Sequence, residues 1–304
     1  MPTRIASDRY TSIDYPRMRE YRLNRTREMM KKFNIGTLIS FEAWDIRYIT
    51  GSYVPPAVKW PEGCFVVLPR NGDPYLFSFS VDSLKAEMPW MKGKIYPQMG
   101  IPKLLFTPEA WDPYMDKIEA IIKEHGLEDE VIGIDGSSNE LIMCKALENR
   151  GFHKYIDAKE CMFEARKIKN EDEIACMVEA QRISEKALET VLHVIKPGMT
   201  ERQVAAELVY NMLKNGSEGN SFDPIVVTGS KTSLPHGVPG DKVIQSGDFV
   251  TMDFGCMYEG YCSDMTRTVC VGEPTEEMEK VYNTVLAAQK AGIAIAKAGV
   301  PGCD

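Results

Sequence analysis

The stretch GDFVTMDFGCMYEGYCSDMTRTVCVG, residues 247–272, has the alternating pattern of two β-strands joined by a tight turn. Successive side chains of a strand point to opposite faces. One face of this hairpin is therefore apolar and consists of Val250, Met252, Phe254, Met265 and Val269. The other face is polar and includes Thr251, Asp253, Asp264, Thr266 and Thr268. An antiparallel ribbon of this kind is expected to pack its apolar face on a core.

The register of the hairpin decides what the two aspartates can do. A turn centred between Tyr258 and Glu259 places Asp253 directly across from Asp264, with apolar side chains aligned on the other face. Facing carboxylates repel each other, so the pair needs a shared proton, solvent or a cation. Divalent metals bind carboxylate oxygens, and a two-metal site needs carboxylates close enough to bridge. From spacing alone, a metal site and an exposed face with two solvated aspartates are equally good interpretations.

Two helices and a loop are expected before the hairpin. Asn170 with Glu173, and Thr200 with Gln203, have the spacing of capping boxes at helix N-termini. The segment 230–241 is a loop rich in proline and glycine, and it contains a single histidine, His236. Helical periodicity returns after Pro274 and continues toward the end of the chain.

The first half of the chain alternates between helical and strand patterns, which is typical of an α/β domain. Helices are predicted over residues 16–33, 108–125 and 138–150. Strands are predicted at Thr37–Phe41, Cys64–Pro69, Tyr75–Phe79 and Val131–Ile134. Asn71-Gly72 is a hairpin turn signal between the second and third strands. We place the domain boundary near Arg166, which gives domains at residues 1–166 and 167–304.

Composition limits the class of protein. The 304 residues carry a formal net charge of -8, which argues against nucleic acid and anionic membranes as partners, since both select basic surfaces. The N-terminus lacks the apolar core of a secretory signal, and no segment reaches the ~18 apolar residues of a membrane span. The eight cysteines form no CxxC pair and favour a reducing compartment. We therefore expect a cytoplasmic protein.

Four motifs between residues 221 and 272 carry a family resemblance: SFDPIVVTG, LPHGVPGD, GDFVTMDFG and GYCSDMTRT. They resemble those of the pita-bread metallopeptidases, especially Xaa-Pro aminopeptidases and prolidases. WDIRYITG, residues 44–51, is similar to a stretch of the creatinase N-terminal domain. The resemblance covers almost the whole chain. It implies an α/β fold in which a creatinase-type N-terminal domain is followed by an incomplete pita-bread (α+β) catalytic domain.

The resemblance also implies roles for individual residues. Asp253 and Asp264 map onto metal ligands that hold two divalent ions, which could be Mn, Co or Zn. His236 maps onto the histidine that contacts substrate and stabilises the tetrahedral intermediate; without the resemblance it is a surface histidine in a loop. The implied partners are a proline-containing peptide or small amide substrate and a second copy of the chain in a homodimer. Arg267 is expected to have a structural role.

The family pattern is not complete in this sequence. Family members carry three further ligands, one His and two Glu, after the two aspartates. No histidine follows His236, and the glutamates after Asp264 lie in a different context, at Glu273, Glu276, Glu277 and Glu279. We therefore expect a C-terminally truncated chain that holds metal weakly or not at all.

Two alternatives to an Xaa-Pro peptidase remain open. The chain could be a non-catalytic dimerisation or regulatory module. The same fold could also act as a creatinase-like C–N hydrolase or a dimethylsulfoniopropionate lyase, because fold does not fix substrate.

Overall fold

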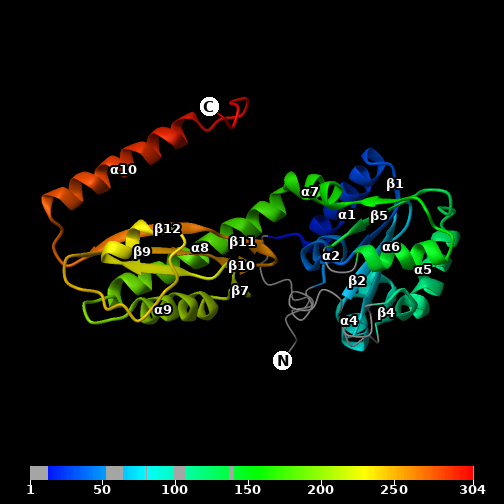
Figure 1. Cartoon of the computed structure of the whole chain (residues 1–304), viewed down its shortest axis with the longest axis horizontal. Coiled ribbons are helices and arrows are strands. Elements are labelled where there is room, and N and C mark those ends of the chain that lie inside the picture. Colours follow the sequence, from blue (N-terminus) through cyan, green and yellow to red (C-terminus); the bar gives the residue numbers. More distant parts are fainter. Residues whose placement is uncertain (1–12, 53–63, 80, 99–106, 137–139, 304) are drawn as a thin grey trace. The chain divides into compact units, whose positions relative to one another are not determined.

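A computed structural model describes residues 13–52, 64–79, 81–98, 107–136 and 140–303 (Figure 1). The chain divides into two compact units, Met1–Ala175 and Cys176–Asp304. The expectation that the chain has no secretory signal depends on the polar N-terminal segment. Most of that segment lies outside the described residues. Within the described ranges, no helix is both long enough and apolar enough to cross a membrane.

The N-terminal unit contains a six-stranded mixed sheet with the strand order β4-β3-β2-β1-β5-β6. Its strands are β1 (Ile35–Ser40), β2 (Cys64–Pro69), β3 (Tyr75–Ser78), β4 (Ile95–Pro97), β5 (Val131–Asp135) and β6 (Tyr155–Asp157). β2 and β3 form the antiparallel hairpin that Asn71-Gly72 predicts. β1 runs parallel to β5, and β5 runs parallel to β6. These parallel pairs confirm the predicted α/β class.

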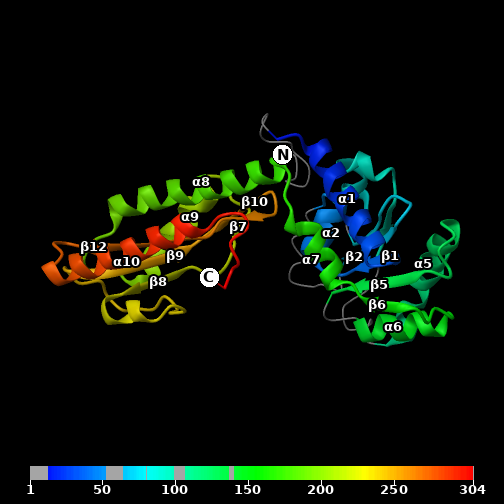
Figure 2. The same cartoon turned by 90° about the horizontal axis from the view of Figure 1, so that it is seen from above.

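Helices cover both faces of this sheet (Figure 2). They are α1 (Tyr15–Lys32), α2 (Ala43–Thr50), α4 (Val81–Glu87), α5 (Asp112–Glu124), α6 (Glu140–Asn149) and α7 (Lys159–Lys167), with short 3-10 turns η2 (Pro89–Met91) and η4 (Pro108–Trp111). Leu38 packs in a core with Met30 of α1 and Met162 of α7. Its neighbour Ile39 packs in a second core with Ile118 of α5. Adjacent residues of a strand point to opposite faces, so the two cores lie on opposite sides of the sheet.

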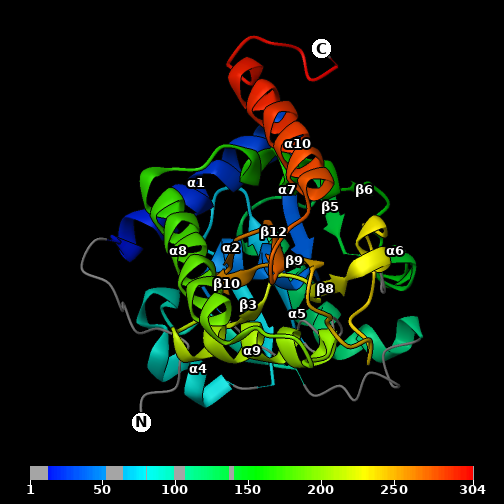
Figure 3. The ribbon, with the colours of Figure 1, turned by 90° about the vertical axis from the view of Figure 1, so that its left-hand side faces the viewer.

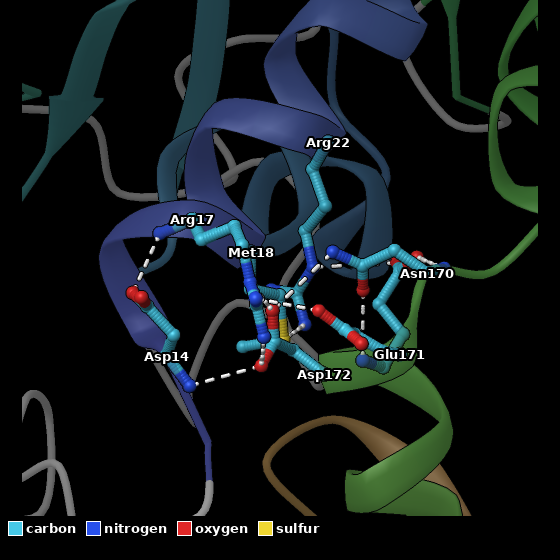
Figure 4. Close-up of polar contacts among 8 residues, drawn as sticks. Asp14, Arg17, Met18, Arg22, Asn170, Glu171 and Asp172 are labelled. Carbon is cyan, nitrogen blue, oxygen red and sulfur yellow. Dashed lines mark hydrogen bonds and ion pairs between the residues drawn. The ribbon is translucent and has the colours of Figure 1, made fainter.

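The first turn of α8 (Glu171–Val194) is held by residues of α1 and the segment before it (Figure 4). Arg17 donates from Nε to Oδ2 of Asp172 at 2.8 Å and from Nη2 to Oδ1 at 2.9 Å. The backbone N–H of Asp14 also donates to Asp172 Oδ1, at 2.9 Å. Bidentate guanidinium–carboxylate contacts combine charge with fixed geometry, so this carboxylate fixes the start of the helix.

The predicted capping box at the start of α8 is confirmed. The N–H of Glu173 donates to Oδ1 of Asn170 at 2.9 Å, and the N–H of Asn170 donates to Oε2 of Glu173 at 2.8 Å. The Glu173 carboxylate also pairs with Arg22, with 3.5 Å between Oε1 and Nε, and both side chains are buried.

Asp172→Asn is expected to lower the free energy of unfolding of the N-terminal unit by about 1–2 kcal/mol at neutral pH. The hydrogen bond from Arg17 holds the pKa of the Asp172 carboxyl below its ordinary value, against the opposing effect of burial. Because this pKa is lowered in the folded state, the contribution is present above the unfolded carboxyl pKa, which is about 3.9. It is lost as the pH falls through the folded value.

Tryptophan fluorescence during urea unfolding measures this effect, because all four tryptophans lie in the N-terminal unit, at Trp44, Trp60, Trp90 and Trp111. Glu171→Gln is the matched control. Glu171 pairs with the same Arg17, but its side chain is 72% exposed. Surface ion pairs contribute little, so this variant should remain within about 0.5 kcal/mol of the wild type. Equal losses in the two variants would contradict the anchoring role of Asp172.

The C-terminal unit contains two three-stranded sheets, β11-β10-β7 and β12-β9-β8. Figure 3 labels all three strands of the second sheet, β8, β9 and β12. The strands are β7 (Gly219–Asn220), β8 (Ile225–Thr228), β9 (Asp248–Phe254), β10 (Cys256–Tyr258), β11 (Tyr261–Cys262) and β12 (Met265–Val271). The other elements are α9 (Glu201–Lys214), η5 (Gly229–Ser233) and α10 (Glu276–Ile295). No side chain of α10 is buried.

Contacts with α8 fix the apolar face of the hairpin. Val250, Met252 and Phe254 are buried, as the alternation of the sequence predicts. The hydroxyls of Ser184 in α8 and Ser263 lie 2.7 Å apart and are buried. The thiol of Cys256 donates to the Ala180 carbonyl of α8 at 3.2 Å. The polar face of the hairpin is thereby turned away from these buried contacts.

Candidate metal centre

The hairpin forms, but its register differs from the predicted one by two residues. Asp253 lies across from Thr266, and Met252 lies across from Arg267. The turn residues are Glu259 and Gly260, with φ values of 50° and 81°. Two consecutive positive φ angles are typical of a type I′ hairpin turn, and this turn moves the centre of the hairpin one residue along the chain. The prediction that Asp253 and Asp264 are directly opposed is therefore wrong.

A shift of two residues keeps every side chain on its predicted face, because the strand period is two. Asp253 and Thr266 therefore share the polar face, and the hydroxyl of Thr266 donates to Oδ1 of Asp253 at 2.5 Å. On the same face, the hydroxyls of Thr251 and Thr268 lie 3.0 Å apart. Asp253 is half-buried. It lies on β9, the central strand of its sheet, so its backbone is held from both sides.

Asp264 lies between β11 and β12, and its side chain is exposed. It precedes Thr266 by two positions, which makes it the diagonal neighbour of Asp253 in the observed register. Diagonal positions on adjacent strands are about 7–8 Å apart. Two carboxylates at this separation can share a cation or water between their oxygens, whereas side chains that were directly opposed would repel more strongly.

Gly255, between β9 and β10, lies where the two sides of the hairpin approach each other closely. A Cβ atom at Gly255 would lie 1.9 Å from the carbonyl oxygen of Ser263 and 2.4 Å from Oγ of Ser221. That same Ser263 carbonyl accepts a hydrogen bond from the Ser221 hydroxyl at 2.8 Å. The two strands therefore approach so closely here that only glycine fits.

His236 is exposed and lies in the loop that follows η5. η5 itself contacts β8 and β9, which places the start of this loop beside the strand that carries Asp253. The N–H of Gly237 donates to the Leu234 carbonyl at 3.1 Å and closes a turn around His236. Arg267 is also exposed, and its Nη1 donates to the Thr266 carbonyl at 2.8 Å.

The described residues contain no group of three or more His, Cys, Asp or Glu side chains that could hold a metal ion. Carboxylate oxygens at the polar face are therefore the candidate donors, and water would have to complete any coordination shell. Two supporting residues were not assigned from the sequence. Thr266 was placed only on the polar face. Glu201, whose carboxylate accepts hydrogen bonds from the N–H groups of Thr228 and Gly240 on either side of His236, had only the sequence pattern of an acidic residue in the first turn of a helix.

Two family models match consecutive parts of the chain. The creatinase/prolidase N-terminal domain matches residues 22–168, and metallopeptidase family M24 matches residues 175–304. The solved Xaa-Pro dipeptidase from Bacillus anthracis is 30% identical with a TM-score of 0.74, and the match covers 92% of this chain and 73% of that one. The chain belongs to metallopeptidase family M24. Its two units have the creatinase-type and pita-bread folds that the sequence motifs predict.

Other M24 relatives include prolidases. The Xaa-Pro dipeptidase of Pyrococcus furiosus is 36% identical over 185 residues, which are 61% of this chain and 52% of that protein. The solved prolidase from Pyrococcus horikoshii is 28% identical with a TM-score of 0.69, covering 89% of this chain and 70% of that one. A second curated relative, an uncharacterised peptidase of Bacillus subtilis, is 45% identical and is covered over 42% of its length. The chain thus spans about half the length of these curated relatives.

Proposed function

We propose that this M24 chain is part of a metal-dependent peptidase that cleaves Xaa-Pro bonds. The observation that carries the proposal is the placement of Asp253 on the polar face of the hairpin, oriented by Thr266 and diagonal to Asp264. The names of the relatives support the substrate class, since two of them are an Xaa-Pro dipeptidase and a prolidase.

The donor chemistry of the two aspartates fits a hard divalent cation, because carboxylate oxygens are the ligands such ions prefer. Asp253 and Asp264 would be the residues of this chain that hold the metal. Bound divalent ions would lower the pKa of coordinated water and polarise the scissile carbonyl. Two carboxylates are a small ligand set, so the affinity is expected to be low in this chain.

The chain's own residues would orient the reaction. The Thr266 hydroxyl donates to one oxygen of Asp253 and leaves the carboxylate fixed on the polar face. His236, exposed in its loop, would donate a hydrogen bond to the oxyanion that develops on the substrate carbonyl. A fixed donor aimed at developing charge is an effective form of transition-state stabilisation.

The proposal also covers the cellular compartment, the domain division and the oligomeric state of the protein. Four of the eight cysteines are buried, at Cys64, Cys161, Cys176 and Cys256, as reduced cysteines often are, which supports a reducing, cytoplasmic compartment. We retain the division into functional domains at residues 1–166 and 167–304, and a homodimer, as part of this proposal.

A substrate panel with added Mn²⁺ tests the reaction class. The panel contains an Xaa-Pro dipeptide, the same dipeptide without proline, creatine and dimethylsulfoniopropionate. We expect release of proline only from the Xaa-Pro dipeptide, and a loss of at least about 100-fold in Asp253→Asn. Preferential turnover of creatine or dimethylsulfoniopropionate would favour the corresponding hydrolase or lyase. The absence of turnover on every substrate would contradict catalysis by this chain and favour a non-catalytic module.

A further inference from the structure

Glu201, the first residue of α9, is completely buried and accepts hydrogen bonds from three donors. Its Oε1 accepts from the N–H of Thr228 at 2.9 Å. Its Oε2 accepts from the N–H of Gly240 at 3.0 Å and from Nζ of Lys231 at 2.6 Å. Nζ of Lys231 also donates to the Val238 carbonyl at 2.7 Å. One carboxylate therefore contacts the segment before His236 and the segment after it.

The donors to Glu201 enclose the loop that carries His236. This loop, residues 229–241, leaves β8 after Thr228 and returns to α9 at Gly240. Backbone hydrogen bonds continue the attachment: the N–H of Arg202 donates to the Gly240 carbonyl at 3.1 Å, and the N–H of Glu201 donates to the Lys242 carbonyl at 3.1 Å. The two ends of the loop are thus held together on the first turn of one helix.

Between the two ends of the loop, the turn at His236 packs against the sheet. A Cβ atom at Gly237 would lie 2.6 Å from Cγ1 of Val227, so the backbone next to His236 lies directly against β8. The imidazole itself is exposed. Its position therefore depends on how the loop backbone is held.

The usual role of an acidic residue in the first turn of a helix is to interact with the helix dipole. Glu201 does not fit that role, because its three donors all lie outside α9. The N-terminus of α9 is capped instead by Thr200, whose hydroxyl accepts a hydrogen bond from the N–H of Gln203 at 3.2 Å. Burying a carboxylate destabilises the folded state unless the carboxylate is paired and hydrogen-bonded. The burial of Glu201 together with its three donors therefore indicates a specific structural role.

The charge state agrees with this geometry. Burial alone would raise the pKa of the Glu201 carboxyl, but hydrogen bonds from Lys231 and from the N–H groups of Gly240 and Thr228 outweigh it and lower the pKa. The carboxylate is therefore ionised at neutral pH, and all three partners donate to it.

We infer that Glu201 is a positioning residue that holds the His236 loop against the sheet and so sets the place of the His236 imidazole. The inference rests on the role proposed above for His236, but it concerns the loop itself. Its test therefore uses a readout that needs neither bound metal nor turnover.

Glu201→Gln is the decisive variant, because the amide has the size of the carboxyl but turns its NH₂ group toward at least one of the donors. Hydrogen exchange of the whole chain, read by mass spectrometry, should show residues 228–241 exchanging about tenfold faster or more. The imidazole signals of His236, assigned by their absence in His236→Asn, should shift or broaden. Amides of β1 and β5 in the other unit should not change.

Glu207→Gln is the matched control, since Glu207 lies on the same helix but is not among the residues that hold the loop. It should leave both readouts unchanged. Lys231→Met, which removes one of the three donors to Glu201, is measured in parallel. If Glu201→Gln folds poorly, the comparison of Lys231→Met with the wild type still tests the inference.

Faster exchange confined to the loop in either variant supports the inference. Unchanged loop exchange and unchanged His236 signals in a folded variant would overturn it. Faster exchange spread equally over β9 and β12 would also overturn it, because that result describes a general structural role. A chain without peptidase activity would count against the proposed function alone, since these readouts do not depend on activity.

Discussion

Gly255→Ala is expected to unfold the C-terminal unit while the N-terminal unit stays folded. The added Cβ would lie 1.9 Å from the Ser263 carbonyl oxygen, a backbone atom that cannot move without breaking the hairpin. It would also displace the Ser221 hydroxyl, which donates to that carbonyl. Clashes with backbone in a buried position belong to the most damaging substitutions, and we expect a loss of more than about 4 kcal/mol.

The two units can be monitored separately in this experiment. Tryptophan fluorescence reports only the N-terminal unit, because every tryptophan precedes Ala175. It should give an unchanged unfolding curve, while hydrogen exchange shows loss of protection in β9 and β12. The control is Gly292→Ala in α10, where an added Cβ has nothing within 4 Å. Alanine is favoured over glycine in helices, so this variant should be neutral or slightly stabilising. Full protection of β9 in Gly255→Ala would refute the close approach.

Asp135→Asn is expected to stabilise the N-terminal unit at alkaline pH. Asp135 ends β5 and is buried, and its Oδ2 accepts from the Ser40 hydroxyl at 2.5 Å. Burial and the neighbouring Asp45 carboxylate raise the pKa of Asp135 to about 7. Asp45 is itself paired with Arg166, with 2.9 Å between Oδ1 and Nη1. Asp135 therefore keeps its proton below about pH 7, and its protonated carboxyl donates a hydrogen bond to Asp45.

The direction of the pH effect follows from this raised pKa. The unfolded chain loses the Asp135 proton near its ordinary pKa of 3.8, whereas the folded chain keeps it until about pH 7. The folded state thus binds more protons in this range, and wild-type stability falls as the pH rises from about 4 to about 7. An asparagine cannot ionise, and it still has an oxygen for Ser40 and an NH₂ donor for Asp45.

Urea unfolding followed by tryptophan fluorescence between pH 4 and pH 8 measures the effect. Asp135→Asn should be more stable than the wild type by about 2–4 kcal/mol at pH 8, with the difference shrinking toward zero near pH 4. Asp82→Asn, an exposed aspartate in α4, should give the wild-type profile. If Asp135→Asn destabilised the unit at every pH, the buried pair would not share a proton as described.

The hairpin shows which features the sequence can predict. Alternation placed Val250, Met252 and Phe254 on a buried face, and the structure confirms it. The register failed because a two-residue shift leaves both faces unchanged, so face matching cannot detect it. The missing information was in the turn: Glu259-Gly260 supplies the positive φ angles that a two-residue loop needs.

Local signals predicted local structure well elsewhere in the chain. The capping boxes at Asn170 and Thr200 form as their spacing indicates. Non-local contacts could not be predicted from the sequence. Asp45 and Asp135 lie 90 residues apart and meet only because β1 and β5 are neighbours in the sheet. Glu201 likewise meets its donors only after the loop has folded back on α9.

Titration calorimetry with Mn²⁺, supported by electron paramagnetic resonance of the bound ion, tests the central claim that Asp253 and Asp264 bind metal. The wild-type chain should bind with a Kd of about 10⁻⁴–10⁻³ M, as expected for few carboxylate ligands. Asp253→Asn and Asp264→Asn should each weaken binding by about tenfold or more. The control is Asp241→Asn. The Asp241 side chain is 83% exposed in the loop, so this variant should bind Mn²⁺ as the wild type does. Binding that is absent in the wild type, or unchanged in both hairpin variants, would contradict the account.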